Sequence, residues 1–217
     1  MPSHPDYFEV HIDVFEQLNQ RAQIVPELSP AELVSAILEE FGGDLDYLGP
    51  GPEQYRLRKS ESTDGLDNHL SVGEQVAPGE RLVLEERDTP LPSGAARPSV
   101  PIYLQDVGSR HSFRVAWLPA FVGRADPNTP GNELLAVDLS TASGGSNVSR
   151  RHLKLWEDKD GFRVQAASNN PAAVVRQDGV EVPMPQPPDS APLQSRDVIR
   201  LERSGLALKF IVREQLP

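Results

Sequence analysis

Two short segments in the second half of the chain carry side chains that could bind an anion together. Arg124 directly follows Gly123 at the end of an apolar run, and Ser149, Arg150 and His152 come about 25 residues later. A guanidinium fork matches two oxygens of a phosphate group, and a serine hydroxyl can donate a hydrogen bond to a third. These residue types indicate phosphate recognition, provided that the fold brings the two segments together.

Simpler interpretations of the same residues stay open at this point. Arg124 could be an ordinary surface arginine, Ser149 could be a turn residue whose hydroxyl bonds its own backbone, and Arg151 is expected at a solvated strand edge. The five histidines show no spacing typical of a zinc site, and the chain has no cysteine. Thiol catalysis, disulfides and thiolate metal sites are therefore excluded, and no metal site or other cofactor is predicted.

The segments around these residues read as nearly all strand. Short alternating or apolar runs, separated by turn residues, predict strands at 102–104, 113–117, 135–139, 153–156, 162–164, 173–175, 198–201 and 206–212. Many short strands favour a β-sandwich, in which function is expected in the loops at one edge of the sheets. Trp117 and Trp156 fall within these strand patterns and are expected in the core.

Gly123-Arg124 followed by a Ser-x-x-His segment resembles the two signature motifs of the forkhead-associated (FHA) family, whose members bind phosphothreonine. The resemblance covers essentially the whole second half of the chain. It implies that Arg124 and Ser149 hold the phosphate and that Arg150 adds a second donor. It also implies structural support from Gly123 and from His152, which in the family braces the loop and does not contact the ligand.

A third family motif is altered in this chain. FHA domains usually carry Asn-Gly-Thr followed by Asn-Gly, whereas this sequence has Asn169-Asn170-Pro171 and then Asp178-Gly179. The resemblance implies that Asn170 contacts the peptide backbone, and Asn169 is the second candidate contact. Pro171 fixes φ and removes an amide donor, so it could reshape the loop and weaken or abolish ligand binding.

The first half of the chain has a different pattern. Residues 8–14 alternate as a half-buried strand does, Ser29 and Glu32 form a capping box, and Leu33, Ile37 and Phe41 lie on one helical stripe. Gly42-Gly43 is expected to end that helix, and further strands are predicted at 22–25, 54–59 and 81–86.

This order of a hairpin, one helix and further strands resembles the ubiquitin superfamily, most closely the small ubiquitin-like proteins of bacteria, some of them associated with type VII secretion. The predicted fold class is therefore two domains, an α+β ubiquitin-like β-grasp roll followed by an all-β FHA-type sandwich. The chain continues past this segment and has no exposed Gly-Gly tail there, so conjugation is not implied. An interaction or spacer role is expected instead.

The predicted domains are residues 1–88 and 102–217, joined by a proline-rich linker at 89–101. Residues 1–90 hold 19 acidic against 6 basic residues, and residues 91–217 hold 13 against 15. The acidic half argues against nucleic acid or an anionic membrane as its partner. No apolar run is long enough for membrane insertion, and no secretory signal is recognised, which favours the cytoplasm.

Together these features predict a binding adaptor and not an enzyme. Its expected partners are a Thr-phosphorylated protein in a Ser/Thr kinase pathway and, through the ubiquitin-like domain, a secretion-system or membrane-complex component. One alternative is a phosphate-independent scaffold, suggested by Pro171, and a less favoured one is an enzyme with an unrecognised site. Thr89, if phosphorylated, could also occupy the chain's own site.

Overall fold

The computed structural model describes residues 7–126, 128 and 132–213. The ends of the two predicted domains, residues 1–6 and 214–217, lie outside the described residues. Contacts divide the chain into two compact units, Met1–Asp88 and Thr89–Gln215, here called the N-unit and the C-unit. Within the described residues, no helix is long and apolar enough to cross a membrane.

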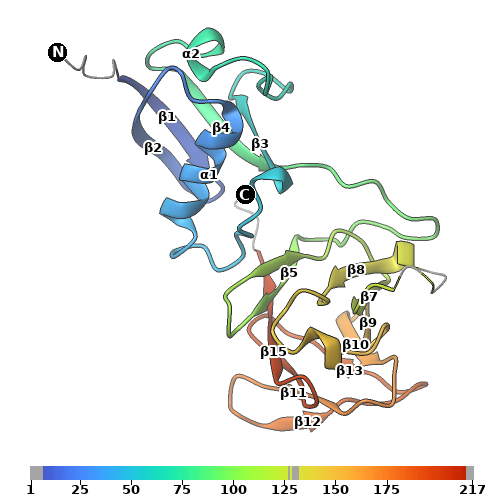
Figure 1. Ribbon diagram of the computed structural model, residues 1–217. Helices are drawn as coiled ribbons and strands as arrows, with labels where there is room; N and C mark the ends of the chain where they lie inside the picture. The colour runs from blue at the N-terminus through green and yellow to red at the C-terminus, as the bar shows by residue number, and fades with distance from the viewer. Residues whose placement is uncertain (1–6, 127, 129–131, 214–217) are drawn as a thin grey trace. The chain divides into compact units, whose positions relative to one another are not determined.

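The described part of the N-unit contains a four-stranded mixed sheet with the order β2-β1-β4-β3 (Figure 1). β1 is antiparallel to β2 and parallel to β4, and β3 is antiparallel to β4. The strands are β1 (Phe8–Val14), β2 (Gln17–Ile24), β3 (Tyr55–Lys59) and β4 (Arg81–Glu86). The predicted alternation in β1 is confirmed, because Val10, Ile12 and Val14 are buried. The strand predicted at 22–25 was too short, since pairing with β1 extends it back to Gln17.

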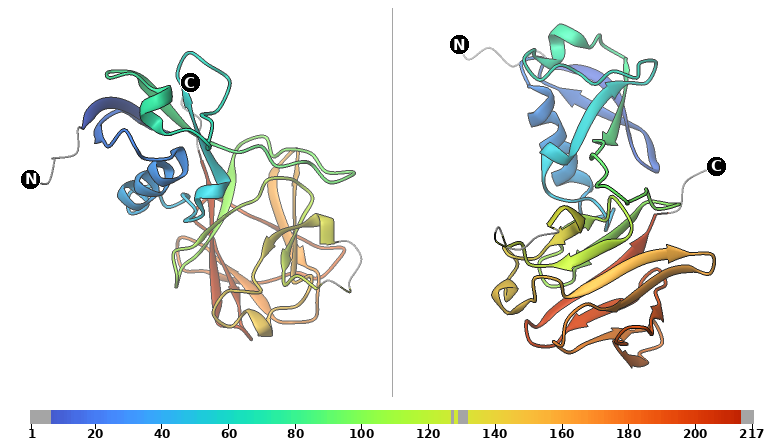
Figure 2. Two further views of the ribbon diagram at one scale, coloured as in Figure 1. Left: turned by 45° about the horizontal axis from the view of Figure 1, so that its top comes forward. Right: turned by 90° about the vertical axis from the view of Figure 1, so that its right-hand side faces the viewer.

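The helix α1 (Pro30–Phe41) begins at the predicted capping box. The Ser29 hydroxyl accepts a hydrogen bond from the Glu32 backbone N–H, and the Glu32 carboxylate accepts one from the Ser29 backbone N–H at 2.8 Å. These two bonds satisfy donors that a helix start leaves unpaired. Leu33 and Ile37 lie on the buried stripe that packs against the sheet, and α1 lies across one face of it (Figure 2).

Two short helical segments complete the N-unit. η1 (Pro52–Gln54) is a 3₁₀ turn that leads into β3. α2 (Val72–Gln75) begins at a second capping box formed by Ser71 and Glu74. The serine-to-glutamate spacing that marks α1 therefore also marks α2.

The C-unit is built from two sheets. In its described residues the five-stranded sheet has the order β13-β10-β9-β7-β8, and the six-stranded sheet has the order β12-β11-β14-β15-β5-β6. The strands are β5 (Ile102–Asp106), β6 (Ser112–Arg114), β7 (Ala120–Gly123), β8 (Leu135–Asp138), β9 (Leu153–Asp158), β10 (Gly161–Ala166), β11 (Ala172–Val175), β12 (Glu181–Pro183), β13 (Ala191–Pro192), β14 (Val198–Leu201) and β15 (Leu206–Val212). Two 3₁₀ turns, η2 (Asn132–Leu134) and η3 (Gly145–Asn147), lie in the loops before β8 and β9.

One apolar core joins the two sheets of the C-unit. Val122 and Leu155 from the five-stranded sheet pack in the same buried cluster as Leu104, Ile199 and Phe210 from the six-stranded sheet. The predicted β-sandwich is confirmed by this shared core. The loops that connect the strands lie at the surface along the edges of the sandwich, where a binding site can form.

One strand prediction and one core prediction in the C-unit were wrong. The strand expected at 113–117 ends at Arg114: beyond Val115, whose N–H still bonds the Ile102 carbonyl, the chain turns away from β5, and Leu118 exchanges backbone hydrogen bonds with Ala96. Trp117 packs against the core as expected, but Trp156 is only half-buried and lies beside Lys154, whose ammonium group is 5.9 Å from the ring centroid. Lys154 and Trp156 occupy the face of β9 opposite the buried Leu155, since side chains alternate along a strand.

The second half of the predicted linker is attached to the C-unit. Ala96 pairs with Leu118, and the Arg97 guanidinium donates to the carbonyl oxygens of Ala116 and Thr89 at 3.0 and 2.5 Å. Ser99 donates its backbone N–H to the Glu157 carboxylate at 2.9 Å. Polar contacts thus fix much of this proline-rich segment to the C-unit.

Candidate functional site

Strand pairing brings the two predicted phosphate-binding segments to one end of the five-stranded sheet. β7 and β9 are antiparallel neighbours, so the residue after β7 and the residues before β9 lie at the same end. Two backbone hydrogen bonds extend the pairing there, from His152 N–H to the Val122 carbonyl at 2.9 Å and from Arg124 N–H to the Ser149 carbonyl at 3.0 Å. Arg124 and Ser149 are therefore adjacent although 24 residues separate them in sequence.

Gly123 is required by this close approach of two backbones. A Cβ atom at Gly123 would lie 2.4 Å from the carbonyl oxygen of Arg150 and 2.7 Å from that of Ser149. Such distances are sterically impossible without moving the backbone of the serine loop. The glycine of the Gly-Arg motif thus meets a packing requirement of the two adjacent backbones.

The Arg124 side chain is half-buried and points along the serine loop. Its Nε–H donates to the Val148 carbonyl at 3.4 Å, a long hydrogen bond. Among the residues that the structure describes, no carboxylate lies within ion-pair distance of this guanidinium. Arg124 therefore retains a positive charge that no described carboxylate neutralises.

Ser149 is joined to Asn170, the third part of the candidate site. β9 and β10 are also antiparallel neighbours, so the segment after β10 reaches the same end of the sheet, and Ala167 N–H bonds the His152 carbonyl at 2.9 Å. The Asn170 side-chain amide donates to the Ser149 hydroxyl oxygen at 2.7 Å. Because this hydroxyl acts as an acceptor toward Asn170, its own hydrogen remains available for a ligand oxygen.

Pro171 does not remove Asn170 from the site. The Asn170 backbone N–H bonds the Ser168 hydroxyl at 3.3 Å, and Pro171 is exposed immediately before β11. Asn169 is exposed, and of the two predicted asparagines it is Asn170 whose side chain the structure joins to Ser149. The Asp178-Gly179 turn joins β11 to β12, with Gly179 in the left-handed region at φ 84°.

His152 supports the serine loop from below. It is 1% exposed, and its Nδ1 atom accepts a hydrogen bond from the Ser149 backbone N–H at 3.3 Å. Burial lowers the pKa of His152, which favours the neutral ring that this acceptor role needs. The histidine contacts the Ser149 backbone and not its hydroxyl, so the pair lacks the geometry of a nucleophile and its general base.

Arg150 and Arg151 have different surroundings. The Arg150 guanidinium forms an ion pair with Asp126, with Nε 2.5 Å from Oδ2. Arg151 lies over the Phe121 ring, 5.6 Å from its centroid, and donates to the Asn132 side-chain oxygen at 2.9 Å. The solvated strand edge expected for Arg151 is thus a packed position, whereas the predicted ligand donor Arg150 is held by an acidic side chain.

Two aspartates at the site escaped the sequence analysis as functional residues. Asp138 accepts hydrogen bonds from the backbone N–H groups of Ala125 and Ser140, both at 2.9 Å, and so fixes the chain directly after Arg124. Burial alone would raise the pKa of Asp138, but these two bonds hold it below its ordinary value. The other is Asp126. The contacts that tie them to the site, with Ala125 and with Arg150, come from distant parts of the chain and leave no local sequence signal.

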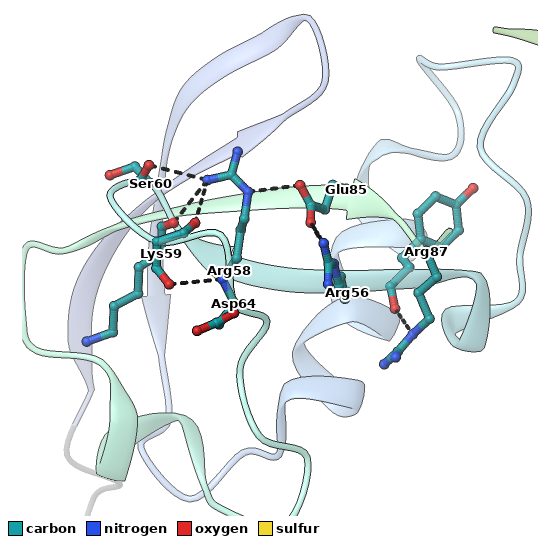
Figure 3. Close-up of polar contacts among 9 residues, drawn as sticks. Arg56, Arg58, Lys59, Ser60, Asp64, Glu85 and Arg87 are labelled. Atoms are coloured by element: carbon teal, nitrogen blue, oxygen red, sulfur yellow. Dashed lines mark hydrogen bonds and ion pairs between the residues drawn. The ribbon is translucent and has the colours of Figure 1, made fainter. Parts of the chain in front are cut away.

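A second charged cluster lies on the sheet of the N-unit, where Glu85 sits between two arginines (Figure 3). Its carboxylate accepts from Arg56 Nε at 2.6 Å and from Arg58 Nε at 2.8 Å. Arg58 also donates to the carbonyl of Lys59, at the end of β3, and to two carbonyls of the following loop, and Arg87 donates to the Tyr55 carbonyl at 2.8 Å. These cations are occupied by internal partners, so the cluster stabilises a strand and its loop.

The described residues contain no group of three or more His, Asp or Glu side chains arranged to hold a metal ion. The donors at the end of the five-stranded sheet are instead suited to an anion. Arg124 offers a guanidinium group, Ser149 offers a hydroxyl hydrogen, and Asn170 offers an amide. This combination of donors can bind a phosphate group and a peptide backbone through hydrogen bonds.

Comparisons with known proteins give structural neighbours only. No family model and no curated protein matches the chain. The FHA domain of human APLF in complex with an XRCC1 bisphosphopeptide is 21% identical and covers 51% of this chain and 97% of its own, with a TM-score of 0.37. The FhaA FHA domain in complex with the intracellular domain of Rv3910 is 25% identical and covers 53% of this chain and 100% of its own, with a TM-score of 0.35.

A designed protein based on ubiquitin is also similar to part of the chain. It is 23% identical and covers 42% of this chain and 100% of its own, with a TM-score of 0.32. The solved structures similar to this chain thus include both FHA domains and one ubiquitin-based design.

Proposed function

We propose that the C-unit is a phosphothreonine-binding module and that the chain acts as a protein–protein interaction adaptor. Arg124 would clasp two phosphate oxygens, and the Ser149 hydroxyl would donate to a third. Asn170 would orient that hydroxyl and meet the peptide backbone. The single observation that carries the proposal is the meeting of an arginine without a described acidic partner and a serine whose hydroxyl hydrogen is uncommitted, at one end of one sheet.

The strength of such a site would come from charge-assisted hydrogen bonds. A phosphothreonine carries a charge of roughly −1.5 to −2 and three acceptor oxygens, and each bond to a charged partner is worth about 1.5–3 kcal/mol. Loss of the Arg124 guanidinium should therefore weaken binding about tenfold to a hundredfold. Binding of a nonphosphorylated peptide should be too weak to measure by comparison.

The test is a titration of the full chain with phosphothreonine peptides and with the same peptides carrying plain threonine. Arg124→Ala is the diagnostic variant. Arg200→Ala is the control, because it removes an exposed arginine that is paired with Glu181 on another strand of the C-unit. Equal affinity of the wild-type chain for both peptides would refute phosphate recognition. A phosphate-independent partner that still binds Arg124→Ala would instead support the scaffold alternative suggested by Pro171.

The N-unit is proposed as a second docking surface of ubiquitin-like type. Support comes from its order of hairpin, helix and further strands, with β1 parallel to β4 at the centre of the sheet. A secretion-system or membrane-complex component stays the proposed partner of this unit. Affinity capture should compare the wild-type chain with a variant in which the acidic side chains of α1 are replaced by basic ones. A partner captured only by the wild-type chain binds this unit.

A further inference from the structure

We propose that Asp126 is a built-in competitor of the phosphate: it holds Arg150 in an ion pair that a ligand must break, and so makes the site selective for a dianion. This inference rests on the proposed phosphothreonine-binding function and adds a residue that controls it. A singly charged carboxylate arriving at the site would only replace one carboxylate with another, whereas a phosphate brings more charge and more acceptor oxygens.

The ion pair is the first observation behind this inference. Arg150 Nε lies 2.5 Å from Asp126 Oδ2, and the Arg150 side chain is 59% exposed whereas that of Asp126 is only 14% exposed. Arg150 lies directly after Ser149, so its guanidinium is within reach of a phosphate bound there. The arginine can thus turn toward a ligand, while the more enclosed aspartate stays in place.

A chain of contacts holds Asp126 in position. The Asn132 side-chain amide donates to the Asp126 carbonyl at 2.6 Å, and the Asn132 side-chain oxygen accepts from Arg151 at 2.9 Å. Arg151 is anchored over the Phe121 ring on β7. The Asp126 carboxylate also accepts a hydrogen bond from the Asn128 backbone N–H at 2.9 Å. These contacts distinguish the pair from an incidental surface contact between two flexible side chains.

Asp126 would affect binding in two ways. It would keep Arg150 away from the ligand until the ion pair is exchanged, and its negative charge would repel the incoming phosphate. Half-exposed ion pairs are individually weak, and a tenfold change in affinity corresponds to about 1.4 kcal/mol. The expected gain on neutralising Asp126 is accordingly about threefold to tenfold in affinity.

The experiment measures the affinity of the full chain for a phosphothreonine peptide and for the same peptide with glutamate at that position. Asp126→Asn keeps the shape and the hydrogen bond to Asn128 but removes the charge. It should bind the phosphopeptide about threefold to tenfold more tightly and should discriminate less against the glutamate peptide. The gain should largely vanish when Arg150→Ala is combined with it. Glu181→Gln, which breaks an arginine pair elsewhere in the C-unit, is the matched control and should change neither affinity.

The outcomes separate this inference from the proposed function. If the wild-type chain prefers the phosphopeptide over plain threonine but Asp126→Asn binds no tighter, the competitor role of Asp126 is wrong and the proposed function stands. If the wild-type chain ignores phosphorylation, the proposed function fails. An NMR measurement tests the ion pair itself: the Nε–H signal of Arg150 should move in Asp126→Asn without any ligand, and in the wild-type chain on addition of O-phospho-L-threonine. An unmoved signal would overturn the inference.

Discussion

The sheet of the N-unit and the candidate site of the C-unit use their positive charges in opposite ways. Five of the six Lys and Arg residues in the first 88 form ion pairs among the described residues, on or beside the open face of the sheet. At the candidate site, Arg124 has no carboxylate partner among the residues that the structure describes, and Arg150 forms an ion pair with Asp126. The comparison teaches that pairing, and not the number of charges, distinguishes a stabilising cluster from a candidate binding site.

The largest effect is expected from Gly123→Ala. The added methyl group would collide with the serine loop, and overpacking of this kind costs about 1–3 kcal/mol. Phosphopeptide binding should be lost together with much of the stability of the C-unit, as measured by calorimetric unfolding and peptide titration. Gly43→Ala in the N-unit is the control, since nothing lies within 4 Å of a Cβ there. A Gly123→Ala variant of normal stability would show that the close approach is not rigid.

A smaller effect is expected from Asn170→Ala. The substitution removes the donor that orients the Ser149 hydroxyl, a bond worth about 0.5–1.5 kcal/mol, and phosphopeptide affinity should fall up to about tenfold. Asn169→Ala, at the exposed neighbour, should change the affinity less. The reverse order of the two variants in a peptide titration would mean that the bound state uses the other asparagine.

The pH dependence of the C-unit should reveal His152. Its pKa is lowered by burial in the folded chain, while in the unfolded chain it is about 6.5. The unfolded state therefore binds more protons as the pH falls below about 6.5, and the C-unit should lose stability from there down to the folded pKa. An NMR titration of the His152 ring in the folded chain, compared with the chain in urea, checks the direction. A folded midpoint at or above the unfolded one would contradict the account.

The smallest effect is expected in the N-unit cluster. Glu85→Gln weakens two partly exposed ion pairs, each worth about 0.2–1 kcal/mol, and should slightly lower the free energy of unfolding of the N-unit. It should leave phosphopeptide binding unchanged. Glu39→Gln makes the same charge change on the exposed side of α1 and serves as the control. A clear loss of peptide binding in Glu85→Gln would assign this cluster a role in recognition after all.

Local sequence patterns predicted those parts of the fold that local physics decides. The Ser29–Glu32 capping box placed the start of α1, and alternation placed β1 and the strands of the sandwich. The sequence patterns gave wrong predictions where contacts between residues distant in sequence determine the extent of a strand or the direction of a side chain. β2 is lengthened by its partner β1, β6 is shortened because Leu118 pairs with Ala96, and Trp156 faces away from the core.

The same division applies to the candidate site. Arg124, Ser149 and Asn170 were proposed from motifs, and the structure brings them to one end of a sheet, although their roles in binding stay predictions. Asp126 and Asp138 were not found, because nothing in their own neighbourhood signals contacts with a loop twelve or more residues away. The different roles of Arg150 and Arg151 also depend on which loop each side chain meets.

The attachment of residues 96–99 to the C-unit has a practical consequence for fragments of this protein. Ala96 and Leu118 exchange two backbone hydrogen bonds, and Arg97 covers the Ala116 carbonyl. A fragment beginning at Ile102 would strip these partners away and leave uncovered backbone groups of the kind that invite strands of other molecules to add on. Such a fragment should aggregate more readily than one that begins at Thr89.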